Sequence, residues 1–68
     1  MNRQEIIRDI KKEKSSFLSI TDIADYLQQS RESTRELMAG TEHLNAGRAK
    51  KYFVNDVADR ILATRAVG

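Results

Sequence analysis

Two helix-start signals that lie close together in the chain constrain its fold more than any other feature. Ser19 is followed three residues later by Asp22, and a hydroxyl at the N-cap with an acid at the third helical position is a variant of the capping box. Apolar side chains then recur at helical spacing, at Ile20, Ile23, Ala24 and Leu27. The sequence therefore predicts a short helix over residues 20–28 that buries one face.

A second helix start follows almost at once, at Ser30. The next helix is expected over residues 31–39, and Gly40 can end it as a left-handed C′ residue. Its inward side chains are expected to be Thr34, Leu37 and Met38. Two helices joined by so short a turn must cross at a steep angle, so residues 19–39 are predicted to form a helix-turn-helix.

Residues 1–14 make up the predicted N-terminal element, an amphipathic helix. Its narrow apolar stripe consists of Ile6, Ile7 and Ile10, and charged residues surround the stripe. A helix of about 12 residues is marginal alone, so it must pack on something. The stripe either covers the core of its own domain, which we favour, or docks on a second copy or a partner.

The pattern changes after the third predicted helix. Two short strand-like runs, His43–Leu44 and Tyr52–Val54, flank a basic, glycine-containing loop at residues 45–50. Such an arrangement predicts a β-hairpin over residues 41–54.

Asn55 is expected to cap a last helix over residues 55–66. The apolar face of this helix consists of Val57, Ala58, Ile61 and Leu62. The predicted fold class is mainly α with a small β-hairpin, and residues 1–68 are expected to form one domain. At this size only about 60% of the surface of the unfolded chain can be buried, so the core is small.

Composition narrows the possible functions. The chain contains no Cys, which removes a disulfide framework and the usual structural zinc sites. No apolar run approaches the roughly 18 residues that span a bilayer, so no membrane association is expected. The expected location is the cytoplasm or nucleoid of a bacterium. Because so small a core leaves little room for a deep pocket, no small-molecule ligand and no cofactor are expected.

The sequence offers no catalytic or metal-binding constellation, so an enzyme is not expected. His43 is the only histidine, and no ligand partners surround it at suitable spacing. It is interpreted as an ordinary strand residue. The serines lack a paired His and Asp, so nucleophilic catalysis has no support. The aromatic side chains are interpreted as core residues: Phe17, Tyr26, Tyr52 and Phe53.

The segments Leu18–Leu27 and Ser30–Leu37 resemble the excisionase and MerR-like family of DNA-binding domains. They carry a hydroxyl cap, two acids, Ala and Leu before the turn, and then Ser-Arg with a β-branched residue and Leu after it. The hairpin and Tyr52–Ala58 resemble the wing and the following helix of that family. The resemblance covers about residues 17–63 and implies a winged helix-turn-helix that binds double-stranded DNA.

The chain departs from this family pattern at two places. Gln28 and Gln29 stand where the turn usually carries Gly and an apolar residue. Because Gln adopts the left-handed conformation only at a cost, the departure predicts a longer or differently wound turn. Thr34 is polar where the family prefers Val or Ile.

In such a fold the N-terminal part of the third helix would meet base edges in the major groove. The outward residues that can reach are Ser30, Arg31, Glu32 and Arg35. Arg can donate two hydrogen bonds to guanine, and Glu32 can accept from the amino group of cytosine or hold a neighbouring Arg. The alternative is a solvated helix face held by charge pairs.

The hairpin carries the second expected set of DNA contacts. Residues 44–54 hold Arg48, Lys50 and Lys51 with no acid, although the formal net charge of the whole chain is only +2. These cations are expected to contact phosphates or, at the tip, the minor groove. The hydroxyl of Tyr52 is a further candidate for a phosphate contact. The alternative is a basic loop that serves solubility.

The resemblance favours an excisionase, or recombination directionality factor, of a phage or mobile element. A transcriptional regulator of prophage or plasmid type is the alternative, and a protein-interaction module with a basic helix-turn-helix face is an alternative of another class. The expected partner is double-stranded DNA, with an integrase or further copies on DNA as candidate protein partners. The free protein is expected to be a monomer, with the hairpin edge and the first helix meeting between copies on DNA.

Overall fold

The computed structural model describes residues 2–65, with side chains described as far as residue 64. In chain order its elements are α1 (Arg3–Glu13), β1 (Phe17–Leu18), α2 (Ile20–Leu27), α3 (Arg31–Met38), β2 (Leu44–Ala46), β3 (Ala49–Phe53) and α4 (Val54–Arg65). The strands form an antiparallel sheet in the order β1-β3-β2. The predicted class, mainly α with a small hairpin, is confirmed, while residues 1 and 66 of the predicted terminal helices lie outside the described residues.

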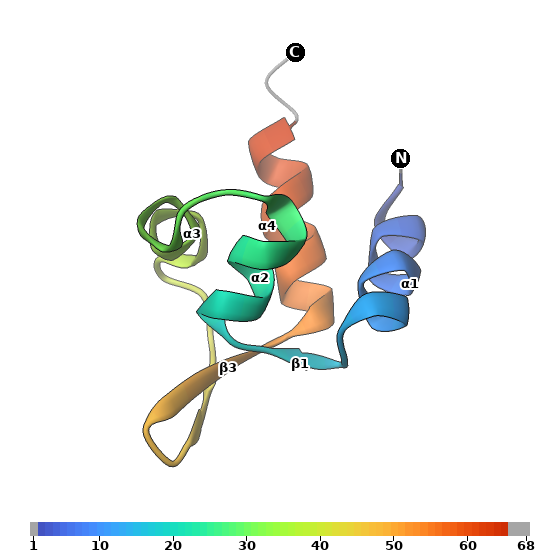
Figure 1. Cartoon of the computed structure of the whole chain (residues 1–68). Coiled ribbons are helices and arrows are strands. Elements are labelled where there is room, and N and C mark those ends of the chain that lie inside the picture. The colour runs from blue at the N-terminus through green and yellow to red at the C-terminus, as the bar shows by residue number, and fades with distance from the viewer. Residues whose placement is uncertain (1, 66–68) are drawn as a thin grey trace.

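Helix α1 packs on α4, as Figure 1 shows. Asn2 is its N-cap, with a side-chain oxygen that accepts from the amide of Glu5 at 2.9 Å. The stripe Ile6, Ile7 and Ile10 is buried within the core of its own chain, so the first interpretation of this helix is confirmed. An ion pair between Arg3 Nε and Asp59 Oδ1, 2.6 Å apart, joins the two helices at their surface.

The expected capping box of α2 is present in full. The hydroxyl of Ser19 accepts from the amide of Asp22, and the carboxylate of Asp22 accepts from the amide of Ser19, both at 3.1 Å. Two of the orphan amides of the helix start are thereby satisfied. The pKa of Asp22 lies below its ordinary value, chiefly because the backbone N–H of Ser19 stabilises the carboxylate.

The prediction of a longer or differently wound turn after α2 is wrong. Gln28 takes the left-handed conformation itself, with φ 54° and ψ 49°. Its amide donates to the carbonyl of Asp25, and the amide of Gln29 donates to the carbonyl of Ala24. These two bonds form a Schellman motif, so glutamine occupies the place that glycine usually takes and the turn stays short.

Polar Thr34 is accommodated at the centre of the helix pair. Its side chain is fully buried, and its hydroxyl donates to the carbonyl of Ser30 at 2.9 Å while it accepts from Gln29 Nε2 at 3.1 Å. A buried hydroxyl with both partners carries little penalty. Gly40, expected to follow the helix in a left-handed conformation, has φ +81°.

Strand β1 was not predicted from the sequence. Phe17 pairs with Phe53 and Leu18 pairs with Tyr52, which adds a third strand to the hairpin. The expected cap at Asn55 is also wrong, because α4 already begins at Val54. The amide of Val54 donates to the carbonyl of Ser16 at 2.8 Å, so a distant segment of the chain satisfies this helix start.

The predicted hairpin is present, but its strands extend further into the basic segment than expected. Residues 45–50 were predicted to be loop, whereas the connection is only Gly47 and Arg48, with Ala46 paired to Ala49. Gly47 has φ +64°, and a positive φ at the first central residue is what a two-residue type II′ turn requires. His43 precedes β2 and is not a strand residue.

Candidate nucleic-acid interface

Helix α3 is held in place from both ends. At its start the hydroxyl of Ser30 accepts from the amide of Ser33 at 3.1 Å. At its end the guanidinium of Arg60, from α4, donates to the carbonyls of Leu37 at 2.8 Å and of Ala39 at 3.1 Å. The last carbonyls of a helix lack partners within it, so Arg60 fixes the position of α3 relative to α4.

The exposed charges of α3 separate into two stripes. Arg31 and Arg35 lie one turn apart on one side, and Glu32 and Glu36 lie one turn apart on the neighbouring side. All four side chains are exposed, and among the described residues none takes part in an ion pair within 4.0 Å. The alternative of a helix face held by charge pairs therefore has no contact to support it.

Ser30, the first residue of the predicted recognition set, is exposed but already engaged. Its hydroxyl accepts from the amide of Ser33 and donates to Ser33 Oγ at 3.0 Å. Its main role in the structure is therefore to cap α3.

The acids of α2 near this surface are partly neutralised. Asp25 forms an ion pair with Lys14 at 2.6 Å, and this hydrogen bond raises the pKa of Lys14. Asp22 is occupied by the capping box, and Lys51 and Lys14 contribute to the lowering of its pKa after the hydrogen bonds from Ser19. Arg31 lines a concavity next to Asp25, so it lies at the junction of α2 and α3.

The residues predicted to form a wing divide between the two faces of the hairpin. Lys50 pairs with Asn45 and lies on the same face of β3 as Tyr52, because side chains alternate along a strand. Lys51 pairs with Leu44 on the opposite face and is half-buried, whereas Arg48 and Lys50 are exposed. The sequence analysis treated the two lysines as one set, and the alternation of the strand separates them.

The aromatic residues are not all in the core. Tyr52 is 7% exposed and its ring lies 5.7 Å from that of His43, so it is a core residue and not an open surface contact. Tyr26 is half-buried, and its hydroxyl donates to Asp9 Oδ2 at 2.5 Å. Burial and this bond raise the pKa of Tyr26 to about 12. The prediction is wrong for Phe17 and Phe53, which are 42% and 40% exposed.

The predicted DNA-contact residues that are exposed lie on α3 and the hairpin, away from α1. Figure 1 shows α3 and the hairpin on one side of α4, and α1 on the other side. Of the predicted contact residues, the exposed ones are Ser30, Arg31, Glu32, Arg35, Arg48 and Lys50. Since α3 carries two Arg and two Glu, its own formal charge is zero, and the surplus of positive charge comes from the hairpin.

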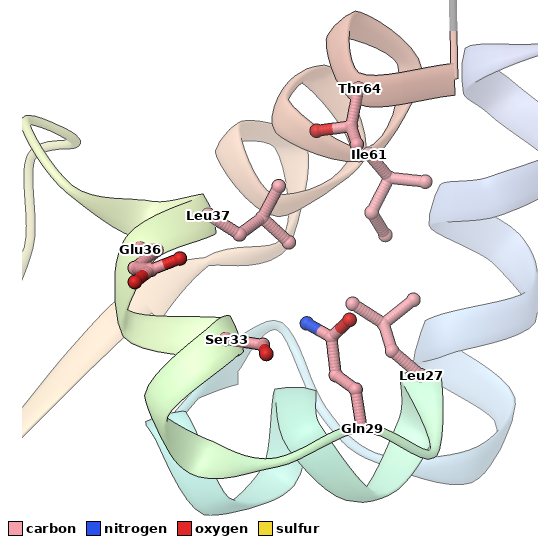
Figure 2. A pocket seen from close by; sticks show the side chains of 7 residues that line it. All are labelled: Leu27, Gln29, Ser33, Glu36, Leu37, Ile61 and Thr64. Carbon is pink, nitrogen blue, oxygen red and sulfur yellow. The ribbon is translucent and has the colours of Figure 1, made fainter.

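A shallow groove of about 430 Å³ lies where α2, α3 and α4 meet (Figure 2). Leu27, Leu37 and Ile61 turn into it, with Gln29 and Ser33 along its side. Among the side chains that the structure describes, Glu36 is the one charged group in its lining, so those side chains form no cluster of titratable groups there.

Comparison of the chain with models of protein families, with curated proteins and with solved structures found no match. Between residues 2 and 65, no helix has the length and apolar character to cross a membrane. In the same part of the chain, no three side chains of the His, Cys, Asp or Glu type gather as metal ligands do.

Proposed function

We propose that this chain binds double-stranded DNA in a sequence-specific manner, as a winged helix-turn-helix with α3 in the major groove and the hairpin as its wing. The observation that carries the proposal is the pair of exposed arginines, Arg31 and Arg35. They lie without ion-pair partners among the described residues on a helix that a short turn and Arg60 hold in place. Two guanidinium groups one turn apart can reach base edges or phosphates of one groove.

The hairpin supports the same proposal through charge. Arg48 at the tip and Lys50 beside it are exposed, and neither has an ion-pair partner in the described part of the chain. Attraction to phosphates supplies affinity for any sequence, and base contacts add the specificity. The two glutamates of α3 repel phosphates, so α3 contributes more to discrimination between sequences than to general affinity.

A titration with labelled duplexes tests the proposal. One duplex has random sequence, and the other is selected from a random library by binding to the protein. We expect Arg35→Ala to weaken binding to the selected duplex by about 1–3 kcal/mol and to leave random-duplex binding almost unchanged. Lys50→Ala should weaken both and reduce the slope of log K against log salt by about one.

Lys12→Ala is the matched control, because Lys12 is an exposed cation on α1, on the other side of α4. It removes the same charge and should leave both affinities close to those of the parent chain. An equal loss in Lys12→Ala and Lys50→Ala would mean that only net charge matters and that the proposed surface is wrong.

Within DNA binding, we propose the role of an excisionase that shapes recombination-site DNA and contributes no chemistry. This narrower proposal rests on the resemblance over residues 17–63. A transcriptional regulator would use the same surface, so the distinction needs the location of the target. Footprinting across the genetic neighbourhood of the gene should protect a recombination site under the first role and a promoter under the second.

A further inference from the structure

The large apolar side chains that are exposed in the described part of the chain lie together on one face of the sheet. They are Phe17, Leu44 and Phe53, with exposed fractions of 42%, 57% and 40%. Phe17 pairs with Phe53 across β1 and β3, and Leu44 pairs with Lys51 across β2 and β3. Because Lys51 and Phe53 are two residues apart in β3, all four side chains share one face, here called the outer sheet face.

The outer sheet face is continuous and forms a shallow depression. Its four residues line a single depression of about 340 Å³ together with Glu42, His43 and Asp56. The rings of Phe17 and Phe53 are 5.5 Å apart at an interplanar angle of 40°, which makes a fixed apolar floor. Contiguous apolar side chains with a polar rim mark an interaction surface more often than single exposed ones do.

The charges at the rim indicate the kind of partner. Two carboxylates, Glu42 and Asp56, border the apolar floor, with Lys51 as the cation beside them. Two carboxylates against one lysine give this rim a negative formal charge, so it attracts a phosphate backbone less than the basic hairpin tip does. Because the rim carries both signs, a two-fold rotation can bring the lysine of one copy to a carboxylate of the other, as an isologous contact requires.

We propose that the outer sheet face of one copy docks on the outer sheet face of a second copy. The two-fold contact places the phenylalanines of both copies against each other and Lys51 of each copy near Glu42 of the other. The contact replaces the first helix as the expected meeting surface, because the Ile stripe of α1 is already buried in its own core.

The size of this face makes the contact weak in free solution. A fully buried Phe covers about 150–250 Å², so the exposed parts of the three apolar side chains add up to roughly 250 Å². A stable dimer buries about 800 Å² per partner. The free protein therefore stays monomeric at tens of micromolar, whereas neighbouring copies on one duplex meet at effective concentrations of about 1 mM.

The use of the contact on DNA rests on the proposed function, but the contact itself does not, so its test omits DNA. Side-chain and amide NMR signals are recorded from about 50 μM to 1 mM, the range over which a weak contact becomes populated. We expect concentration-dependent shifts at Phe17, Leu44 and Phe53 and none on α1. Shifts that are absent at 1 mM, or centred on α1, overturn the proposal.

A charge-reversal pair makes the test specific for a two-copy contact. Lys51→Glu and Glu42→Lys should each abolish the concentration dependence, because each places like charges together in a self-pair. Mixing the two variants should restore it, and labelling one variant makes the mixed pair visible. If mixing restores nothing while both variants unfold at the same urea concentration as the parent, the two-fold contact is wrong. Because this test contains no DNA, a failure of the protein to bind DNA would not change the result of the mixing experiment.

Discussion

The left-handed residue between α2 and α3 offers a quantitative test of the turn. Gln28 has φ 54° and ψ 49°, and in the described part of the chain its exposed side chain makes no hydrogen bond. A residue with a Cβ pays about 1–2 kcal/mol in this conformation. Glycine removes that cost but loses about 0.5–1 kcal/mol more conformational freedom on folding. Gln28→Gly should therefore raise the free energy of unfolding by about 0.5–1 kcal/mol.

Urea unfolding followed by circular dichroism measures this change. The midpoint should rise at an unchanged m-value, and the thermal midpoint should rise by roughly 2–8 °C for a domain of this size. Gln28→Ala is the control, because it removes the same polar group but keeps the Cβ, and it should stay within about 0.5 kcal/mol of the parent. If alanine stabilises as much as glycine, the left-handed strain is not the cause and the reasoning fails.

Three further predictions concern contacts that the sequence does not reveal or reveals only in part. Arg60→Met should lower the free energy of unfolding by about 1–2 kcal/mol, because the terminal carbonyls of α3 lose a charged donor; a loss no larger than that of Lys12→Met would refute this role. Asp22 has a lowered pKa, so its stabilisation is present above its ordinary pKa and is lost as the pH falls through the folded value. Urea midpoints between pH 5 and pH 2 should therefore fall less steeply for Asp22→Asn, and parallel curves would contradict it. The pKa of Tyr26 is raised to about 12, so stability should fall as the pH rises from about 10 to 12. Tyr26→Phe should flatten this alkaline loss, and an unchanged slope would show that neither burial nor the Asp9 contact raises the pKa of Tyr26 in solution.

The helices around the turn could be predicted from the sequence because their signals are local. The capping pair Ser19 and Asp22 and the second cap at Ser30 lie within three residues of the groups that they satisfy. The left-handed turn also has a local cause, the Schellman motif at Gln28. The sequence does not show this motif, because glycine usually stands at its left-handed position and here that position is a glutamine.

The missed features depend on segments that are distant in the sequence. The start of α4 at Val54 is satisfied by the carbonyl of Ser16, and the end of α3 is satisfied by Arg60. A strand of two residues has no period to detect, so β1 could not be recognised.

The candidate site was only partly predictable for a related reason. Charge and helical spacing are enough to predict which residues of α3 and the hairpin belong to the site. That Lys50 and Lys51 lie on opposite faces depends on where β3 begins. Once β3 is known to start at Ala49, the two-residue period of a strand places the two lysines on opposite faces.

The measurement that tests DNA binding most directly is an amide NMR titration of the parent chain with a short duplex at low protein concentration. The account predicts that the largest shifts fall on the exposed residues of α3, from Arg31 to Arg35, and on the hairpin tip from Gly47 to Lys50. These shifts should fade as salt displaces the protein from phosphate. Shifts that spread evenly over the surface, or that centre on α1, would contradict the account.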